Sequence, residues 1–124
     1  MTTYIIIAAV VLIIGFLYLK SKGGDQSFNN LSVNNLGPLM KNKDTILIDV
    51  RTQNDISQGV IGKPLKIKLG PSMNKKLSTL DRNKKYVVYC RSGVRSAMAS
   101  KMMVKMGFED VNNLLGGYSA WNQR

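Results

Sequence analysis

Short apolar runs that alternate with helical patterns are the feature that most constrains the fold of this 124-residue chain. Residues 45–50 (TILIDV) and 86–89 (YVVY) are continuous apolar runs, which is typical of strands buried on both faces. Helical patterns are predicted at residues 53–58, 73–80 and 96–106, with a brief strand at 65–67. Strands that alternate with helices favour a parallel sheet, so we predict one α/β domain of about a hundred residues.

The first helix of this domain is predicted directly after Ser32, which is a favourable N-cap residue. Gly37 and Pro38 follow within the same pattern, and we expect them to interrupt or end the helix early. Near the other end of the chain, Gly107 is placed as the C-cap of the helix predicted at 96–106.

The N-terminal segment has a different character from the rest of the chain. Residues 4–19 (YIIIAAVVLIIGFLYL) carry no charge and would span about 24 Å as a helix. We interpret residues 1–20 as a transmembrane anchor, 21–30 (SKGGDQSFNN) as a flexible linker and 31–124 as the folded domain. A cleavable signal peptide is the alternative, but no Lys or Arg precedes Lys20 and a small-x-small cleavage pattern is missing.

The charge distribution supports this interpretation and suggests an orientation. The formal net charge is +11, and every Lys and Arg lies at or after Lys20. The positive-inside bias then places the domain in the cytoplasm, held at the inner membrane by a single-pass helix. An anionic lipid surface suits so basic a chain. Nucleic acid is not an expected partner because the sequence contains no zinc-finger or RNP motif.

The reactive side chains are few, and this restricts the chemistry. The chain has no histidine and one cysteine, Cys90, so an intrachain disulfide cannot form. Ser-His-Asp hydrolysis, Cys-His proteolysis and the common zinc sites are excluded for lack of imidazole. We therefore expect no metal and no cofactor. A lone cysteine is more often a small buried apolar residue than a nucleophile, so Cys90 has to be judged by its neighbours.

Those neighbours favour an anion site. Cys90 follows a predicted strand directly, which places it at the carboxyl edge of the sheet, where α/β folds bind their ligands. The loop after it consists of Arg91, Ser92, Gly93, Val94 and Arg95. The backbone N–H groups of Ser92, Gly93 and Val94, together with the N-terminus of the next helix, form a cradle for negative charge. The two arginines should favour the thiolate. In the alternative interpretation, the cysteine is merely packed and the arginines pair with Asp49 or Asp110.

At this point the chain strongly resembles the rhodanese family. The resemblance rests on residues 47–51 (LIDVR), 87–97 (VVYCRSGVRSA), 107–108 (GF) and 115–121 (LGGYSAW), and it covers residues 31–122. It implies a three-layer α/β fold with a small parallel sheet. It also implies that Cys90 takes sulfane sulfur from a donor such as thiosulfate, carries it as a persulfide and passes it to cyanide or a thiol. The loop 91–95 would hold the persulfide, and Asp49 and Arg51 would support the loop.

The resemblance is weakest between residues 52 and 68. Family members usually have an acidic helix with an aromatic residue there, followed by a stretch similar to Gly-His-Ile-Pro-Gly. This chain has residues 59–63 (GVIGK) instead. The difference concerns local packing and pocket shape rather than the nucleophile, because the sulfur chemistry needs no histidine base.

Two other functions remain open. One is a membrane-tethered persulfide carrier or sulfur-binding module with little turnover of its own, which would deliver sulfur to a protein acceptor. The other is a cysteine phosphatase. Phosphatases of this kind have five residues between Cys and Arg, whereas four separate Cys90 from Arg95, and no counterpart of their general-acid aspartate is obvious. The physiological donor, the acceptor and the oligomeric state do not follow from the sequence.

Overall fold

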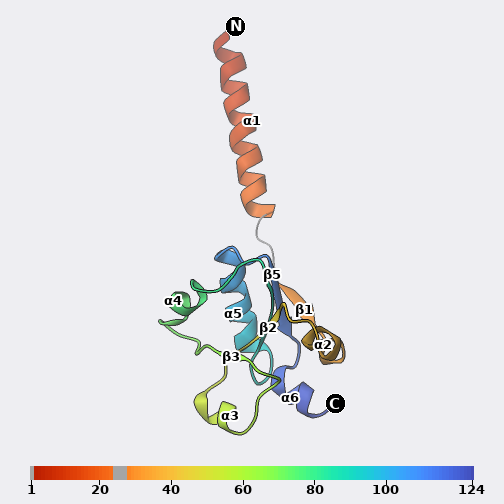
Figure 1. Ribbon diagram of the computed structural model, residues 1–124. Coiled ribbons are helices and arrows are strands. Elements are labelled where there is room, and N and C mark those ends of the chain that lie inside the picture. The colour runs from red at the N-terminus through yellow and green to blue at the C-terminus, as the bar shows by residue number, and fades with distance from the viewer. Residues whose placement is uncertain (1, 24–27) are drawn as a thin grey trace.

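The computed structural model describes residues 2–23 and 28–124. Its folded part is built on a five-stranded parallel sheet with the strand order β1-β5-β4-β2-β3 (Figure 1). The strands are β1 (Asn29–Leu31), β2 (Thr45–Asp49), β3 (Leu65–Lys66), β4 (Lys85–Tyr89) and β5 (Asp110–Leu114). The predicted strands at 45–50, 65–67 and 86–89 correspond to β2, β3 and β4, and the parallel α/β sheet is confirmed.

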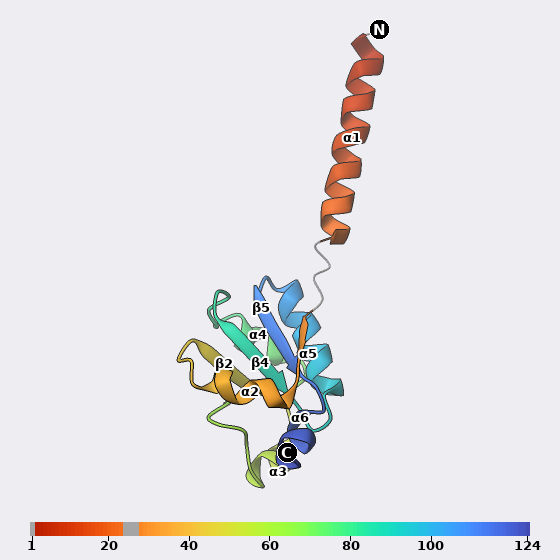
Figure 2. The same cartoon turned by 90° about the vertical axis from the view of Figure 1, so that its right-hand side faces the viewer.

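Helices cover both faces of the sheet, which gives the expected three layers (Figure 2). They are α2 (Val33–Met40), α3 (Gln53–Ser57), α4 (Met73–Leu77), α5 (Val94–Lys105) and α6 (Gly117–Asn122). Residues of α4 and α5 pack with one face of the sheet, and residues of α2 and α6 pack with the other.

The apolar runs of β2 and β4 are explained by this arrangement. Along β4, Val88 contributes to the cluster beside α4 and α5, and Val87 contributes to the cluster beside α2 and α6. Their partners in β2 are Ile48 and Leu47, and all four side chains are buried. A strand that is covered on both faces needs apolar residues at every position, so its sequence does not alternate.

Two strands, β1 and β5, have polar sequences and were not predicted from the sequence. β1 and β5 carry asparagines that pair in register, and those of β5, Asn112 and Asn113, are buried. The Asn112 amide donates a hydrogen bond to the carbonyl of Tyr86 at 3.1 Å. A buried carboxamide is tolerated only with such partners, and these come from distant parts of the chain. Pattern alone therefore cannot identify a strand of this kind.

The prediction that Pro38 would interrupt the first helix is wrong. α2 begins after the N-cap Ser32, whose hydroxyl accepts from the Asn34 N–H at 3.3 Å, and it continues through Pro38 to Met40. Leu36 of α2 is fully buried, and α2 contacts both β2 and α6. This packing offsets the loss of one backbone hydrogen bond at the proline.

The N-terminal apolar run forms α1 (Thr2–Gly23). Between residues 2 and 18 its side chains are exposed on all sides, with Ile5, Leu12 and Phe16 at 69 %, 73 % and 64 %. Among the residues that the structure describes, no helix combines the length and apolar character needed to cross a membrane. This finding does not support the predicted transmembrane anchor, which stays a prediction.

The linker predicted at 21–30 is divided among several parts of the structure. Its first residues continue α1, and residues 24–27 lie outside the described part of the chain. Its last two residues, Asn29 and Asn30, pair with β5 and so belong to the sheet.

We predict that Tyr89→Phe destabilises the full chain by about 1–3 kcal/mol. Tyr89 is fully buried, and its hydroxyl oxygen accepts a hydrogen bond from the Ile61 N–H at 3.0 Å. The substitution leaves that buried N–H without a partner. Urea unfolding measures the change. Tyr86→Phe is the control. The Tyr86 hydroxyl donates to the backbone carbonyl of Asp81, and Asp81 is exposed, so this carbonyl can bind water after the substitution. Equal stability of Tyr89→Phe and wild type would contradict the prediction.

Candidate active site

Cys90 lies where the sequence places it, directly after β4 and at the carboxyl end of the sheet. The loop after it leads into α5, and α3 and α6 lie at the same end of the sheet (Figure 1). Gly93 is the N-cap of α5 and has a φ of 99°, a left-handed conformation that favours glycine. The backbone of the loop therefore turns tightly enough to bring its own N–H groups back toward the Cys90 side chain.

The Cys90 sulfur is surrounded by hydrogen-bond donors. Its Sγ accepts from the Gly93 N–H at 3.1 Å and from the Ser96 hydroxyl at 3.4 Å. Burial by itself raises the pKa of Cys90. The Ser96 hydroxyl and the backbone N–H groups of Ser96, Gly93 and Ser92 outweigh burial and hold the pKa below its ordinary value. The thiolate is thus favoured as expected, but by dipoles of the loop rather than by Arg91 and Arg95.

Ser96 belongs to a network that the sequence analysis missed. Its hydroxyl oxygen lies 2.6 Å from Oδ1 of Asn113 in β5, and Nδ2 of Asn113 donates to the Gly93 carbonyl at 3.2 Å. Ser96 and Asn113 are both buried. One hydroxyl proton therefore serves two acceptors, the Cys90 sulfur and the Asn113 oxygen. The available signal was the position of Ser96 in the first turn of α5, on the side of the helix that faces the loop.

The start of α6 holds the loop from its other side. The Tyr118 N–H donates to the Cys90 carbonyl at 2.8 Å, and the Ser119 N–H donates to the Arg91 carbonyl at 3.0 Å. This close approach requires Gly117, which has a φ of 57°, because a Cβ there would collide with the Cys90 carbonyl. Gly117 therefore serves the backbone geometry at the start of α6.

Asp49 and Arg51 form a buried ion pair at the end of β2, with Nη2 of Arg51 2.8 Å from Oδ2 of Asp49. Nη2 also donates to the Gly59 carbonyl at 2.6 Å, and the guanidinium lies 4.1 Å from the ring centre of Tyr118. No hydrogen bond joins either side chain to Cys90 in the described structure. Their expected support of the loop is therefore indirect and runs through Tyr118, whose backbone N–H binds the Cys90 carbonyl.

The two arginines of the loop do not form the ion pairs of the alternative interpretation. Asp49 is bound by Arg51, and Asp110 lies 3.6 Å from Lys85. Within residues 2–23 and 28–124, the exposed side chains of Arg91 and Arg95 take part in no ion pair.

Both arginines instead line a cleft of about 500 Å³ that Cys90 also lines. Its walls are Arg51, Thr52, Asp55, Cys90, Arg91, Ser92, Val94 and Arg95. Arg51 is paired with Asp49, and the two exposed arginines, Arg91 and Arg95, share the cleft with one further carboxylate, Asp55, so the cleft favours an anionic ligand. Cys90, which is 3 % exposed, is one of the residues that line this cleft. Val94 contributes to the wall, and its side chain is 68 % exposed, but its N–H is not among the donors to Sγ.

Comparison with known proteins agrees with this site. The sequence pattern of the rhodanese-like domain matches residues 32–124. A sulfurtransferase of Allochromatium vinosum is 35 % identical over 83 residues, which are 67 % of this chain and 77 % of the relative. The thiosulfate sulfurtransferase GlpE of Shewanella oneidensis is 31 % identical over 97 residues, 78 % of this chain and 95 % of the relative.

The fold leads to the same result. The crystal structure of a rhodanese-like domain protein from Staphylococcus aureus has a TM-score of 0.68 and 27 % sequence identity, and the match covers 76 % of this chain and 91 % of that one. The sequence match includes Cys90, its loop and the final GGY turn. The chain therefore belongs to the rhodanese-like domain family.

Proposed function

We propose that the protein is a sulfurtransferase that moves sulfane sulfur from an anionic donor such as thiosulfate to a cyanide or thiol acceptor through a persulfide on Cys90. The observation that carries the proposal is the Cys90 sulfur itself. It lies among neutral hydrogen-bond donors at the floor of a cleft lined by three arginines. Relatives named sulfurtransferase and thiosulfate sulfurtransferase support the same reaction class.

The reaction balances without an acid or base from the protein. The Cys90 thiolate attacks the outer sulfur of thiosulfate, an S–S bond forms to Sγ, and the S–S bond of the donor breaks as sulfite leaves with the electron pair. The acceptor then attacks the outer sulfur of the persulfide, and Sγ leaves as a thiolate. A chain without histidine can perform both steps. The donors around Sγ stabilise negative charge on sulfur before and after each transfer.

We predict that Cys90→Ser abolishes thiosulfate:cyanide sulfur transfer, measured as thiocyanate formed. A serine hydroxyl has no accessible deprotonated form that corresponds to the thiolate, and serine cannot carry a persulfide. Intact mass after incubation with thiosulfate should show one added sulfur atom on the wild type, removable by dithiothreitol, and none on the variant. Turnover by the serine variant would contradict the mechanism. A wild type that loads sulfur but turns over with no small acceptor would instead indicate the carrier function.

We predict that Ser96→Ala shifts the reactivity of Cys90 to higher pH. The Ser96 hydroxyl is the foremost of the hydrogen bonds that lower the pKa of Cys90, so its removal raises that pKa and reduces the thiolate fraction at neutral pH. The rate of alkylation by iodoacetamide against pH measures the midpoint. Ser100→Ala is the matched control, because Ser100 is buried in the same helix and bonds the Ser96 carbonyl rather than Sγ. Identical midpoints for Ser96→Ala and wild type would contradict the assignment.

We further propose that α1 attaches the protein to the cytoplasmic membrane, with the domain facing the cytoplasm. Support comes from the apolar side chains of residues 5–17, which are exposed around the whole helix, and from the absence of Lys and Arg before Lys20. A helix that is apolar all round is unfavourable in water.

The full chain should then stay in the membrane fraction at 1 M salt, where the Debye length is about 3 Å, and detergent should release it. Deletion of residues 1–22 should give a soluble protein, and a reporter fused after Arg124 should be cytoplasmic. Release by salt alone would contradict the apolar attachment. A secreted form that begins near residue 21 would indicate a signal peptide instead.

A further inference from the structure

The hydroxyl of Ser96 has one proton and two neighbouring acceptors. Its oxygen lies 2.6 Å from Oδ1 of Asn113 and 3.4 Å from Sγ of Cys90. A hydroxyl hydrogen binds one acceptor well at a time, so these two contacts compete. The sulfur-transfer steps described above use Ser96 as a donor to sulfur and assign no role to Asn113.

The orientation of the Asn113 amide is fixed by its nitrogen. Nδ2 donates to the Gly93 carbonyl at 3.2 Å, and the same carbonyl accepts from the Ala97 N–H at 3.2 Å. If the amide were turned over, Oδ1 would lie against that carbonyl oxygen, and two acceptors repel each other. Oδ1 therefore faces Ser96. Because an amide oxygen cannot donate, the 2.6 Å contact requires the Ser96 proton.

Burial gives this competition an energetic consequence. Ser96 is fully buried and Asn113 is 3 % exposed, so water has little access to either side chain. When the hydroxyl proton points at sulfur, Oδ1 of Asn113 faces the lone pairs of the Ser96 oxygen and has no other donor among the described residues. A buried acceptor without a donor costs free energy. Donation from Ser96 to the sulfur therefore carries a penalty that Asn113 imposes.

The strength of the sulfur as an acceptor changes with its chemical state. A thiolate has a full negative charge on Sγ and attracts the hydroxyl proton strongly. A thiol has no such charge, and in a persulfide the charge lies on the outer sulfur rather than on Sγ. In these two states the Asn113 oxygen is the better acceptor. Asn113 is thus satisfied beside the thiol and the persulfide, and unsatisfied beside the thiolate.

We propose that Asn113 is a positioning residue that competes with Cys90 for the Ser96 proton and thereby favours the persulfide over the free thiolate. The inference rests on the proposed sulfurtransferase function. In loading, an S–S bond forms to Sγ, the S–S bond of thiosulfate breaks, and sulfite leaves with the electron pair, so that atoms and charge balance. Asn113 displaces this equilibrium toward the loaded enzyme. It also limits how far the loop donors lower the pKa of Cys90.

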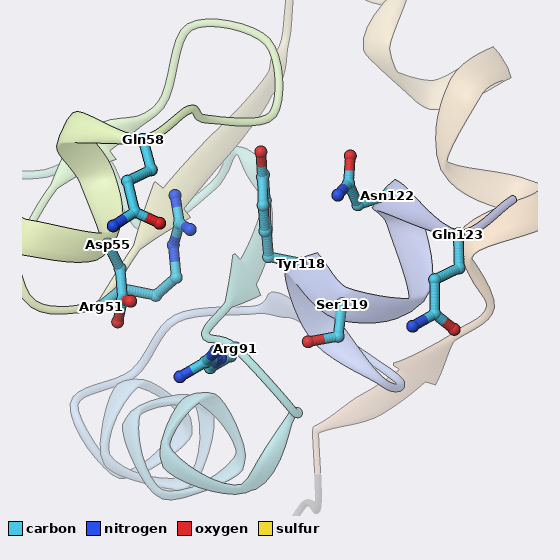
Figure 3. Close-up of a pocket in the computed structure, with 8 residues that line it drawn as sticks. All are labelled: Arg51, Asp55, Gln58, Arg91, Tyr118, Ser119, Asn122 and Gln123. Atoms are coloured by element: carbon cyan, nitrogen blue, oxygen red, sulfur yellow. The ribbon is translucent and has the colours of Figure 1, made fainter.

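The charged and titratable side chains around Cys90 are not part of this competition. They are Asp49 and Arg51 at the end of β2, Asp55 of α3, Arg91 and Arg95 after Cys90, and Tyr118 of α6. Figure 3 shows four of them, Arg51, Asp55, Arg91 and Tyr118, around the cavity between α3 and α6. The residues that α4 packs beside Cys90 are apolar. All of these groups are unchanged in the variants below, so their effect on Cys90 cancels in each comparison.

The sign of a pH shift tests the proposal. Asn113→Leu removes the competing acceptor at similar size, so the midpoint of iodoacetamide alkylation should fall by about 0.7 pH unit, which is about a fivefold change in the ratio of thiolate to thiol. A purely structural role predicts the opposite sign, because a loosened loop offers weaker donors to sulfur. Asn112→Leu is the matched control. Asn112 is the preceding residue of β5 and bonds the Tyr86 carbonyl and Asp110, so its loss should leave the midpoint unchanged.

A double-mutant cycle shows whether the effect passes through Ser96. In the Ser96→Ala background no hydroxyl proton is left to compete for, so Asn113→Leu should not move the alkylation midpoint further. A fall of the same size in both backgrounds would overturn the proposal. Circular dichroism of each variant confirms that it is folded.

A measurement on the wild type does not depend on how the Asn113 variant folds. The side-chain amide resonances of Asn113, followed by NMR in the full chain, should titrate at the pH of the alkylation midpoint, because the Ser96 proton leaves Oδ1 as the thiolate forms. Most of this titration should disappear in Ser96→Ala. Resonances of Asn113 that do not change through the midpoint would overturn the competition.

The loading equilibrium tests the link to sulfur transfer. The full chain is incubated in fixed mixtures of thiosulfate and sulfite, and intact mass gives the fraction of Cys90 that carries sulfur. Above the alkylation midpoints, Asn113→Leu should lower the loading constant about fivefold relative to the wild type. Well below them it should have no effect, since Asn113 serves the thiol and the persulfide equally. Asn112→Leu should match the wild type at both pH values.

The outcomes separate this proposal from the proposed function. If the wild type forms thiocyanate from thiosulfate and cyanide, but Asn113→Leu leaves the midpoint unchanged or raises it, the role of Asn113 is wrong and the sulfurtransferase function stands. An unchanged loading constant above the midpoints likewise overturns the preference for the persulfide. If the wild type takes up no sulfur at all, the proposed function fails, and the alkylation midpoints still decide whether Asn113 competes for the Ser96 proton.

Discussion

The buried guanidinium of Arg51 is the contact on which the surroundings of the nucleophile depend. It joins the end of β2, the segment around Gly59 and the ring of Tyr118, which lies far from the other two in sequence. A buried ion pair gains little net stability, because desolvation costs nearly as much as the attraction returns. Its value here is geometric. The guanidinium contacts the ring of Tyr118, and the backbone N–H of Tyr118 donates to the Cys90 carbonyl, so Arg51 packs against the residue that holds the Cys90 loop.

The pKa of the Cys90 thiol is lowered by neutral groups rather than by ions. The hydroxyl of Ser96 and the N–H groups of the loop lower the pKa of Cys90 against the effect of burial. The arginines of the cleft lie further out, and in the proposed reaction they would attract the anionic donor. The attraction of the donor and the pKa of Cys90 should therefore depend differently on salt concentration. Screening weakens the attraction of the donor to the exposed arginines, whereas short hydrogen bonds to a buried sulfur are little affected.

The parts of the fold that the sequence predicts are those where local pattern and tertiary environment agree. β2 and β4 are apolar because both of their faces are covered. Gly93 stands in a turn that requires a positive φ, which favours glycine. β1 and β5 could not be predicted, since their asparagines are stabilised by partners elsewhere in the chain. The continuation of α2 through Pro38 likewise depends on packing. In the site, Cys90 and its loop were predictable from the strand–loop–helix order. Asn113 was not, because a β5 residue reaches Ser96 only through the fold.

The single proton of Ser96, placed between the Cys90 sulfur and the Asn113 oxygen, has a consequence for the energetics of a catalytic cycle. When the negative charge on sulfur changes, the Ser96 hydroxyl can reorient by rotation about its C–O bond. The Asn113 amide meanwhile keeps its hydrogen bond to the Gly93 carbonyl. The backbone around the nucleophile need not move. In the proposed reaction, the resting and the sulfur-loaded states could therefore share one framework, and little reorganisation energy would be added to either transfer step.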